Sequence, residues 1–152
     1  MDRESCRILL VDDFKPWRRF VVSALQSQPE YQIVGEASEG PEAVEQAQQL
    51  QPDLILLDIG LPKLNGIEVA RRIREISPKS KILFFSENRS SDFAEQALNT
   101  GASGYVVKSS AAHELLPAVK AVIQGKQFIS PSLTGHLLLA TILNVIQTIL
   151  LS

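Results

Sequence analysis

The sequence predicts an α/β fold, a doubly wound parallel sheet of five strands flanked by five helices. Short runs rich in Ile, Val and Leu alternate with longer segments whose apolar residues recur at helical spacing. Several of the short runs are continuously apolar, as expected of parallel strands buried on both faces. Such alternation is typical of a parallel sheet with helices on both sides.

Five apolar runs are expected to form the strands. In chain order they are Arg7–Asp12, Gln32–Ala37, Asp53–Asp58, Lys81–Ser86 and Gly104–Lys108. The segments that follow each run carry apolar stripes of helical period. These stripes are Phe14, Trp17, Val21 and Leu25; Ala43, Val44, Ala47 and Leu50; Ile67, Ala70, Ile73 and Ile76; Ala94, Ala97 and Leu98; and Leu115, Leu116, Val119 and Val122.

Each predicted helix also has a start signal. A proline suits a first turn, and Asn, Asp or Ser followed by an acidic residue suits an N-cap. In chain order the signals are Pro16, Pro41, Asn65 with Glu68, Asp92 with Glu95, and Ser109 or Ser110.

Composition and charge limit the class of protein. At 152 residues, 45% hydrophobic and 21% charged, the chain has the make-up of one globular domain. A net charge of −2 gives no electrostatic case for nucleic-acid binding. Cys6 is the only cysteine, which excludes a disulfide framework. The charged residues 1–5 lack the apolar run of a signal peptide, so we expect a cytoplasmic protein.

Polar residues stand at the predicted strand ends. The first strand ends in Asp12 and Asp13, the third in Asp58, the fourth in Ser86 and the fifth in Lys108. In a doubly wound sheet the functional crevice lies beyond the carboxyl ends of the strands. We therefore expect three carboxylates, a hydroxyl and an amine to meet there.

This set of groups favours phosphoryl transfer. Crowded carboxylates repel one another unless a cation joins them, and oxygen ligands favour a hard ion such as Mg²⁺. A nucleophilic carboxylate beside a metal, a lysine and a hydroxyl suits in-line attack on phosphorus. The alternative is that each aspartate only caps the helix or turn that follows it.

Four motifs closely resemble the response-regulator receiver family, which has the CheY-like, flavodoxin-like fold. They are Leu10-Val11-Asp12-Asp13, Leu56-Leu57-Asp58-Ile59-Gly60-Leu61-Pro62, Asn65-Gly66 and Gly104-Tyr105-Val106-Val107-Lys108. The segments Ile33–Ala37 and Gly125–Ser130 look most like the NarL-like subfamily. The resemblance makes residues 1–130 a receiver domain.

The resemblance implies a phosphorylation site and a metal site. Asp58 would accept a phosphoryl group from a sensor histidine kinase or a phosphotransfer protein. Asp13, Asp58 and Asp12 (partly through water), with the backbone carbonyl of Gly60, would hold Mg²⁺. Lys108 would pair with a phosphoryl oxygen.

The resemblance also implies a switch. The Ser86 hydroxyl would bind another phosphoryl oxygen, and the rotamer of Tyr105 would follow it. Phosphorylation would then change protein contacts in a two-component, phosphorelay signalling system. The chain would catalyse its own phosphorylation and hydrolysis, and would not be an enzyme with a substrate of its own.

Three positions depart from the family pattern. Glu87 stands after the switch hydroxyl, where a small residue is usual, and predicts altered autodephosphorylation; the alternative is an outward-pointing, solvated Glu87. Ser109 follows Lys108 where many relatives have proline, so the bond between them is expected to be trans or strained. Ser86 itself replaces the more common threonine and keeps the hydroxyl.

Residues 131–152 predict an extra, apolar C-terminal helix. Leu137–Leu151 is nearly all apolar, with Thr141, Asn144 and Thr148 as a narrow polar stripe. So wide an apolar face favours packing on the domain or pairing in a homodimer. Membrane contact is the weaker alternative, because a basic polar face is lacking and fifteen residues span only about 22 Å.

Residues after Ser130 contain no Lys or Arg and are too few for the helix-turn-helix domain of NarL-like regulators. Direct DNA binding is therefore not expected. A pseudo-receiver that is never phosphorylated is the alternative function. A flavin-binding protein or small hydrolase of the same fold class is disfavoured, because no glycine-rich phosphate loop follows the first strand.

Overall fold

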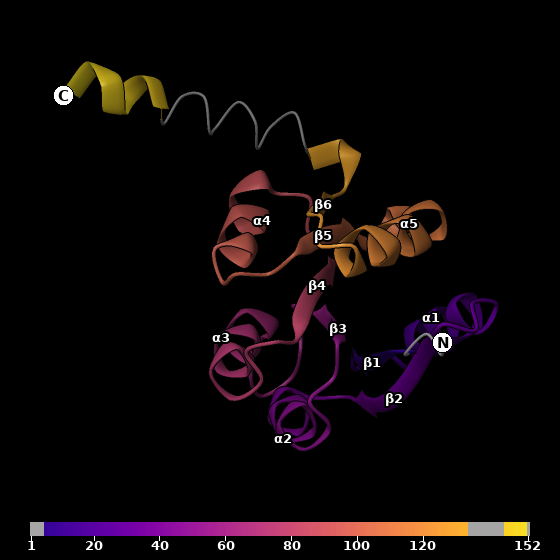
Figure 1. Ribbon diagram of the computed structural model, residues 1–152. Helices are drawn as coiled ribbons and strands as arrows, with labels where there is room; N and C mark the ends of the chain where they lie inside the picture. Colours follow the sequence, from indigo (N-terminus) through magenta and orange to yellow (C-terminus); the bar gives the residue numbers. More distant parts are fainter. Residues whose placement is uncertain (1–4, 134–144, 152) are drawn as a thin grey trace.

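The computed structural model describes residues 5–133 and 145–151, and it contains the predicted doubly wound sheet (Figure 1). All strand pairs are parallel, and the strand order is β2-β1-β3-β4-β5-β6. The strands are β1 (Cys6–Val11), β2 (Tyr31–Ala37), β3 (Leu54–Asp58), β4 (Lys81–Ser86), β5 (Gly104–Val107) and β6 (Phe128–Ile129). The helices are α1 (Lys15–Gln26), α2 (Gly40–Leu50), α3 (Gly66–Ile76), α4 (Ser91–Leu98), η1 (Lys108–Ser110) and α5 (Ala111–Ile123).

Helices cover both faces of the sheet, and the strand side chains alternate between two cores. Ile8 and Leu10 of β1 face a cluster with α1 and α5, whereas Leu9 and Val11 face a cluster with α2, α3 and α4. The central β3 is buried at all of its residues. Burial on both faces explains why the sequence shows continuous apolar runs there.

Asn65 caps the start of α3 as predicted, whereas the Glu68 carboxylate of the expected capping box pairs with Arg71 and Arg72. The Asn65 side chain accepts a hydrogen bond from the Glu68 N–H at 3.1 Å. Gly66 lies so close to the end of β3 that a Cβ atom would stand 2.4 Å from the Asp58 carbonyl oxygen. Glycine therefore lets α3 begin directly behind Asp58.

Two predicted helix starts differ from the structure. The cap of α4 is Ser90, which accepts from the Phe93 N–H at 3.3 Å, so the prediction of Asp92 was wrong by two residues. Ser110 precedes α5 as predicted, but its side chain makes no capping bond. A single turn of 3₁₀ helix, η1, supplies the entry to α5 instead.

A sixth strand extends the five predicted ones. β6 pairs with Gly104 and Tyr105 of β5, and Ser130 continues the pairing through its side chain, whose hydroxyl accepts from the Val107 N–H at 2.8 Å. Two residues are too short a run to show the two-residue period of a strand.

The predicted C-terminal helix lies partly outside the described residues. Residues 131–133 and 145–151 are helical, and Leu133 is buried against the core. Within the described parts of the chain, no helix is both long and apolar enough to cross a membrane.

Candidate functional site

The predicted site residues lie together at one edge of the sheet. Asp12 and Asp13 follow β1, Asp58 and Ser86 end β3 and β4, and Lys108 follows β5. These four strands are neighbours in the order β1-β3-β4-β5, so their carboxyl ends meet. Topology alone thus gathers residues that are up to 96 positions apart.

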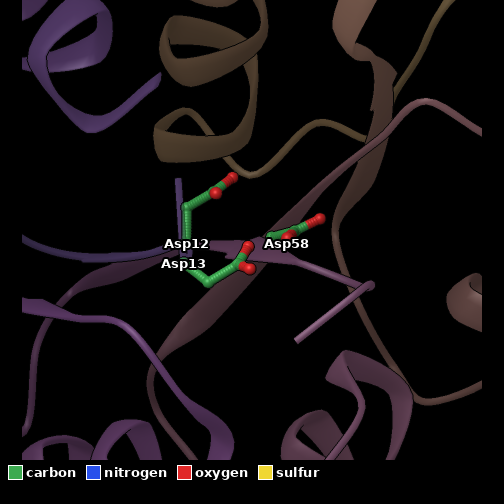
Figure 2. Close-up of side chains that lie close together, drawn as sticks. All are labelled: Asp12, Asp13 and Asp58. Atoms are coloured by element: carbon green, nitrogen blue, oxygen red, sulfur yellow. The ribbon is translucent and has the colours of Figure 1, made fainter. Parts of the chain in front are cut away.

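Three carboxylates form the centre of the site (Figure 2). Asp12, Asp13 and Asp58 each offer an oxygen atom within 4.8 Å of the others. Asp12 is completely buried and Asp58 is 8% exposed, whereas Asp13 is exposed. Asp13 is therefore the carboxylate through which the cluster is open to solvent.

Lys108 neutralises part of this negative charge. Its Nζ lies 2.6 Å from Asp12 Oδ2 and 3.5 Å from Asp58 Oδ1. The Lys108–Ser109 peptide bond is trans, which is one of the two geometries expected for it. The ammonium reaches both buried aspartates with this trans bond in place.

The electrostatic surroundings of Asp58 disfavour its charge. Burial raises the pKa of Asp58 above its ordinary value of 3.8, and the neighbouring Asp12 raises it further. The ammonium of Lys108 and the Gly60 N–H, which donates to Asp58 Oδ1 at 3.2 Å, lower the same pKa but do not cancel the rise.

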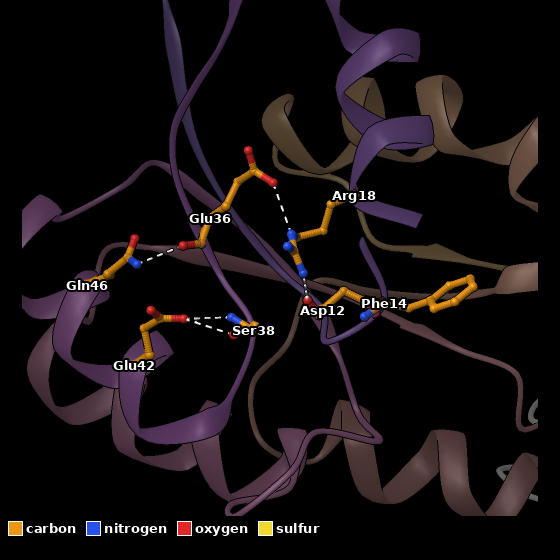
Figure 3. Close-up of polar contacts among 7 residues, drawn as sticks. All are labelled: Asp12, Phe14, Arg18, Glu36, Ser38, Glu42 and Gln46. Atoms are coloured by element: carbon orange, nitrogen blue, oxygen red, sulfur yellow. Dashed lines mark hydrogen bonds and ion pairs between the residues drawn. The ribbon is translucent and has the colours of Figure 1, made fainter. Parts of the chain in front are cut away.

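Asp12 also has a local structural role (Figure 3). Its Oδ1 accepts from the Phe14 N–H at 2.8 Å, and its backbone oxygen accepts from Arg18 Nη1 at 2.6 Å. Arg18 is held in turn by Glu36 of β2, with Nε 3.0 Å from Oε1. The capping role weighed as an alternative is therefore real for Asp12, and it leaves Oδ2 directed at Lys108.

Ser86 and Tyr105 meet at the loop after β4. The Ser86 Oγ accepts from the Asn88 N–H at 3.0 Å, and the Tyr105 hydroxyl donates to the Asn88 carbonyl at 2.7 Å. Both side chains are buried, and burial raises the pKa of Tyr105. Asn88 was not predicted, because it contributes backbone atoms and any residue type supplies those.

A cavity of about 440 Å³ lies over the cluster. Glu87 is exposed at this cavity, as the solvated alternative expected, and is also one of its lining residues. The lining residues are Asp13, Phe14, Asp58, Gly60, Ser86, Glu87, Asn88 and Lys108. Phe14 was expected only as part of a helix stripe, yet it stands before α1 and is 61% exposed.

The donor set fits a small hard cation. Asp13 and Asp58 offer carboxylate oxygens beside a backbone turn at Gly60, with Asp12 behind them, and Mg²⁺ prefers such oxygen ligands. Burial raises the pKa of Asp58 most and repulsion by Asp12 raises it further, and a bound cation would relieve that repulsion.

Replacing Asp58 by asparagine tests this electrostatic balance. A raised carboxyl pKa means that the folded protein holds the proton more tightly than the unfolded chain, so ionisation of Asp58 opposes folding. In a chelator at neutral pH, Asp58→Asn should therefore raise the unfolding midpoint. The gain should shrink as the pH falls toward 3.8, because Asp58 of the folded protein takes up its proton above that pH and then no longer carries the opposing charge. Mg²⁺ should stabilise the wild type far more than the variant.

Thermal unfolding between neutral pH and pH 4, with and without Mg²⁺, measures these differences. The exposed Glu75→Gln removes a charge elsewhere and should change neither the pH dependence nor the Mg²⁺ effect. An Asp58→Asn protein that is less stable than the wild type at neutral pH in chelator would contradict the balance.

The chain is similar to known proteins in sequence. The family model of the response regulator receiver domain matches residues 8–120. The transcriptional regulatory protein DegU of Brevibacillus brevis is 36% identical over 138 residues, which are 91% of this chain and 58% of DegU. The nitrate/nitrite response regulator protein NarL of Escherichia coli is 37% identical over 133 residues, 88% of this chain and 62% of NarL. The chain thus spans about three-fifths of these curated relatives.

Solved structures show the same fold. A LuxR-family two-component response regulator from Aurantimonas sp. has a TM-score of 0.85 and 35% identity, covering 91% of this chain and 99% of its own. The response regulator domain of Thermotoga maritima CheB has a TM-score of 0.73 and 31% identity, covering 79% and 97% respectively. With its acidic cluster at the carboxyl ends of β1 and β3, and with these relatives, the chain belongs to the response regulator receiver domain family.

Proposed function

We propose that this receiver accepts a phosphoryl group on Asp58 from a phosphohistidine of a sensor histidine kinase or phosphotransfer protein, and thereby switches its protein contacts. One observation carries the proposal: the Asp58 carboxylate ends the central strand inside an open cavity, between two aspartates and Lys108. The lone cysteine is unpaired, which suits the proposed cytoplasmic location.

The chemical step is an in-line transfer between two nucleophiles. A carboxylate oxygen of Asp58 forms a bond to phosphorus while the phosphorus–nitrogen bond of the donor breaks, and the electron pair returns to the imidazole, which takes up a proton. Mg²⁺ bound by Asp13, Asp58 and the Gly60 carbonyl, with Asp12 partly through water, would neutralise charge on the transferring oxygens.

The Lys108 ammonium is close enough to Asp58 to contact the phosphoryl group once it is bound there. The ammonium lies 3.5 Å from Asp58 Oδ1 and exchanges part of its contact with Asp12 for a new phosphoryl oxygen. Hydrolysis then reverses the modification, since water attacks phosphorus and the Asp58 carboxylate leaves. The protein is altered by the reaction, so it acts as a signalling module and not as an enzyme with a separate substrate.

The proposed switch runs through the Asn88 backbone. The Ser86 hydroxyl would donate to a phosphoryl oxygen, and its movement toward that oxygen would draw Oγ away from the Asn88 N–H, from which it now accepts. The Asn88 carbonyl is the acceptor of the Tyr105 hydroxyl, so movement of this loop reaches Tyr105. The surface built from α4, β5 and α5 is the proposed output face.

Intact mass after incubation with Mg²⁺ and acetyl phosphate tests the function. The wild type should gain one phosphoryl group, and Asp58→Asn or omission of Mg²⁺ should abolish the gain. Asp13→Asn should slow it strongly, because the remaining carboxylates hold the ion less well. No gain in the folded wild type at any donor concentration would favour the pseudo-receiver instead.

Glu87 is proposed to tune the lifetime of the phosphorylated state. Its carboxylate lines the cavity that a water molecule must cross to reach phosphorus. Glu87→Ala removes a negative group from this path, and we expect the phosphoryl half-life to change by more than about twofold. Glu87→Gln separates charge from size as the matched control. An unchanged half-life in both variants would remove Glu87 from the site.

A second copy of this chain is the proposed partner of the C-terminal segment. Of residues 145–151, five large apolar side chains are exposed, by 46% to 79%: Val145, Ile146, Ile149, Leu150 and Leu151. Exposed apolar area of this kind favours association. Homodimerisation therefore stays our explanation of this segment.

Light scattering at micromolar concentration tests the dimer. Leu150→Glu with Leu151→Glu should convert a dimer to a monomer, because two charges enter the apolar face. Gln147→Glu adds a charge at a polar position of the same segment and should leave the dimer intact. A wild type that is already monomeric would refute this contact.

A further inference from the structure

Trp17 connects helix α1 to the site lysine. Its ring centroid lies 4.9 Å from Lys108 Nζ, within the range of a cation–π contact. The same ring packs against Phe85 of β4 and Phe20 of α1, with centroid distances of 5.5 Å and 5.4 Å. These two ring contacts hold the indole beside the Lys108 ammonium.

The ammonium of Lys108 is bounded by three different groups. Asp12 Oδ2 and Asp58 Oδ1 lie at 2.6 Å and 3.5 Å, and the Trp17 ring lies on another side. The Lys108 side chain is only 14% exposed. An aromatic face attracts a cation but forms no ion pair, so it restrains the ammonium and leaves it able to move between carboxylate and phosphoryl oxygens.

Trp17 and Lys108 also line the same surface groove. This groove of about 590 Å³ is lined by Trp17 together with Phe14, Phe20 and Ala112, and it reaches Lys108 itself. Removal of the indole would widen this groove next to the ammonium. Water would then compete with Asp12 and Asp58 for the hydrogen bonds that the ammonium donates. Trp17 is the third residue of α1, which begins at Lys15 and has Pro16 in its first turn.

We propose that Trp17 is a positioning residue for Lys108, holding the ammonium at the distance from Asp58 at which it meets the incoming phosphoryl group. The proposal rests on the proposed function of Asp58. Trp17 touches neither the phosphoryl donor nor the metal ligands in this scheme; it acts through the lysine.

The initial rate of phosphoryl gain from acetyl phosphate with Mg²⁺ is the first readout. Trp17→Leu should slow the gain about three- to tenfold, and Trp17→Phe, which keeps a ring face, should recover most of it. Tyr31→Leu removes a ring that packs against the same core cluster at the amino end of β2, and it should stay within about twofold of the wild type. In a Lys108→Ala protein, which is already slow, adding Trp17→Leu should slow the gain no further.

The proposal would be overturned if Trp17→Leu gained phosphoryl groups at the wild-type rate, or if this substitution slowed the gain equally in proteins with and without Lys108.

The second readout needs no phosphorylation. In chelator, the unfolding midpoints of Trp17→Leu, Lys108→Met and the double variant should be non-additive, because the single variants break one shared contact. Additive midpoints overturn the positioning role. A wild type that gains no phosphoryl group refutes the proposed function, and the unfolding cycle then decides the contact by itself.

Discussion

Two buried carboxylates that share one ammonium are the constraint around which this receiver is arranged. Asp12 and Asp58 are nearly inaccessible to water, and their negative charges repel each other because their carboxylate oxygens lie within 4.8 Å. Lys108 makes the pair tolerable, because its Nζ contacts both. Removing the ammonium would leave two buried carboxylates without their counter-charge, so the pair depends on Lys108.

The remaining structure places these three groups. The parallel sheet brings the ends of β1, β3 and β5 to one edge, and Gly66 lets α3 turn away directly behind Asp58. The Asp12 carboxylate starts the turn into α1 with one oxygen and meets Lys108 with the other. Local backbone needs and the chemistry of the site are therefore met by the same side chains.

Apolar pattern and strand-end polarity were enough to predict the sheet, its five principal strands and the meeting of Asp12, Asp13, Asp58, Ser86 and Lys108. A sequence pattern predicts the strands because burial on both faces makes every residue of a strand apolar. It predicts the meeting of the polar residues because all strands run in the same direction and end at the same edge of the sheet. The roles of Ser86, Tyr105 and Gly60 came from resemblance, and they remain proposals.

The features that sequence reasoning missed depend on atoms that pattern does not encode. β6 is two residues long and is completed by the Ser130 hydroxyl. Ser90, not Asp92, caps α4. Ser and Asp are both good N-caps, so the residue that caps is the one whose backbone is extended where the helix begins, and sequence alone does not show this. Asn88 and Trp17 contact Tyr105 and Lys108 across the fold, and neither contact leaves a local signal in the sequence.

The place of Trp17 has an optical consequence. Trp17 is the only tryptophan in the chain, and a charged ammonium stands against its ring. Indole emission responds to nearby charge, so any event that displaces Lys108 changes the light that the protein emits. The receiver thus contains a built-in fluorescent reporter of its own lysine, which needs no label.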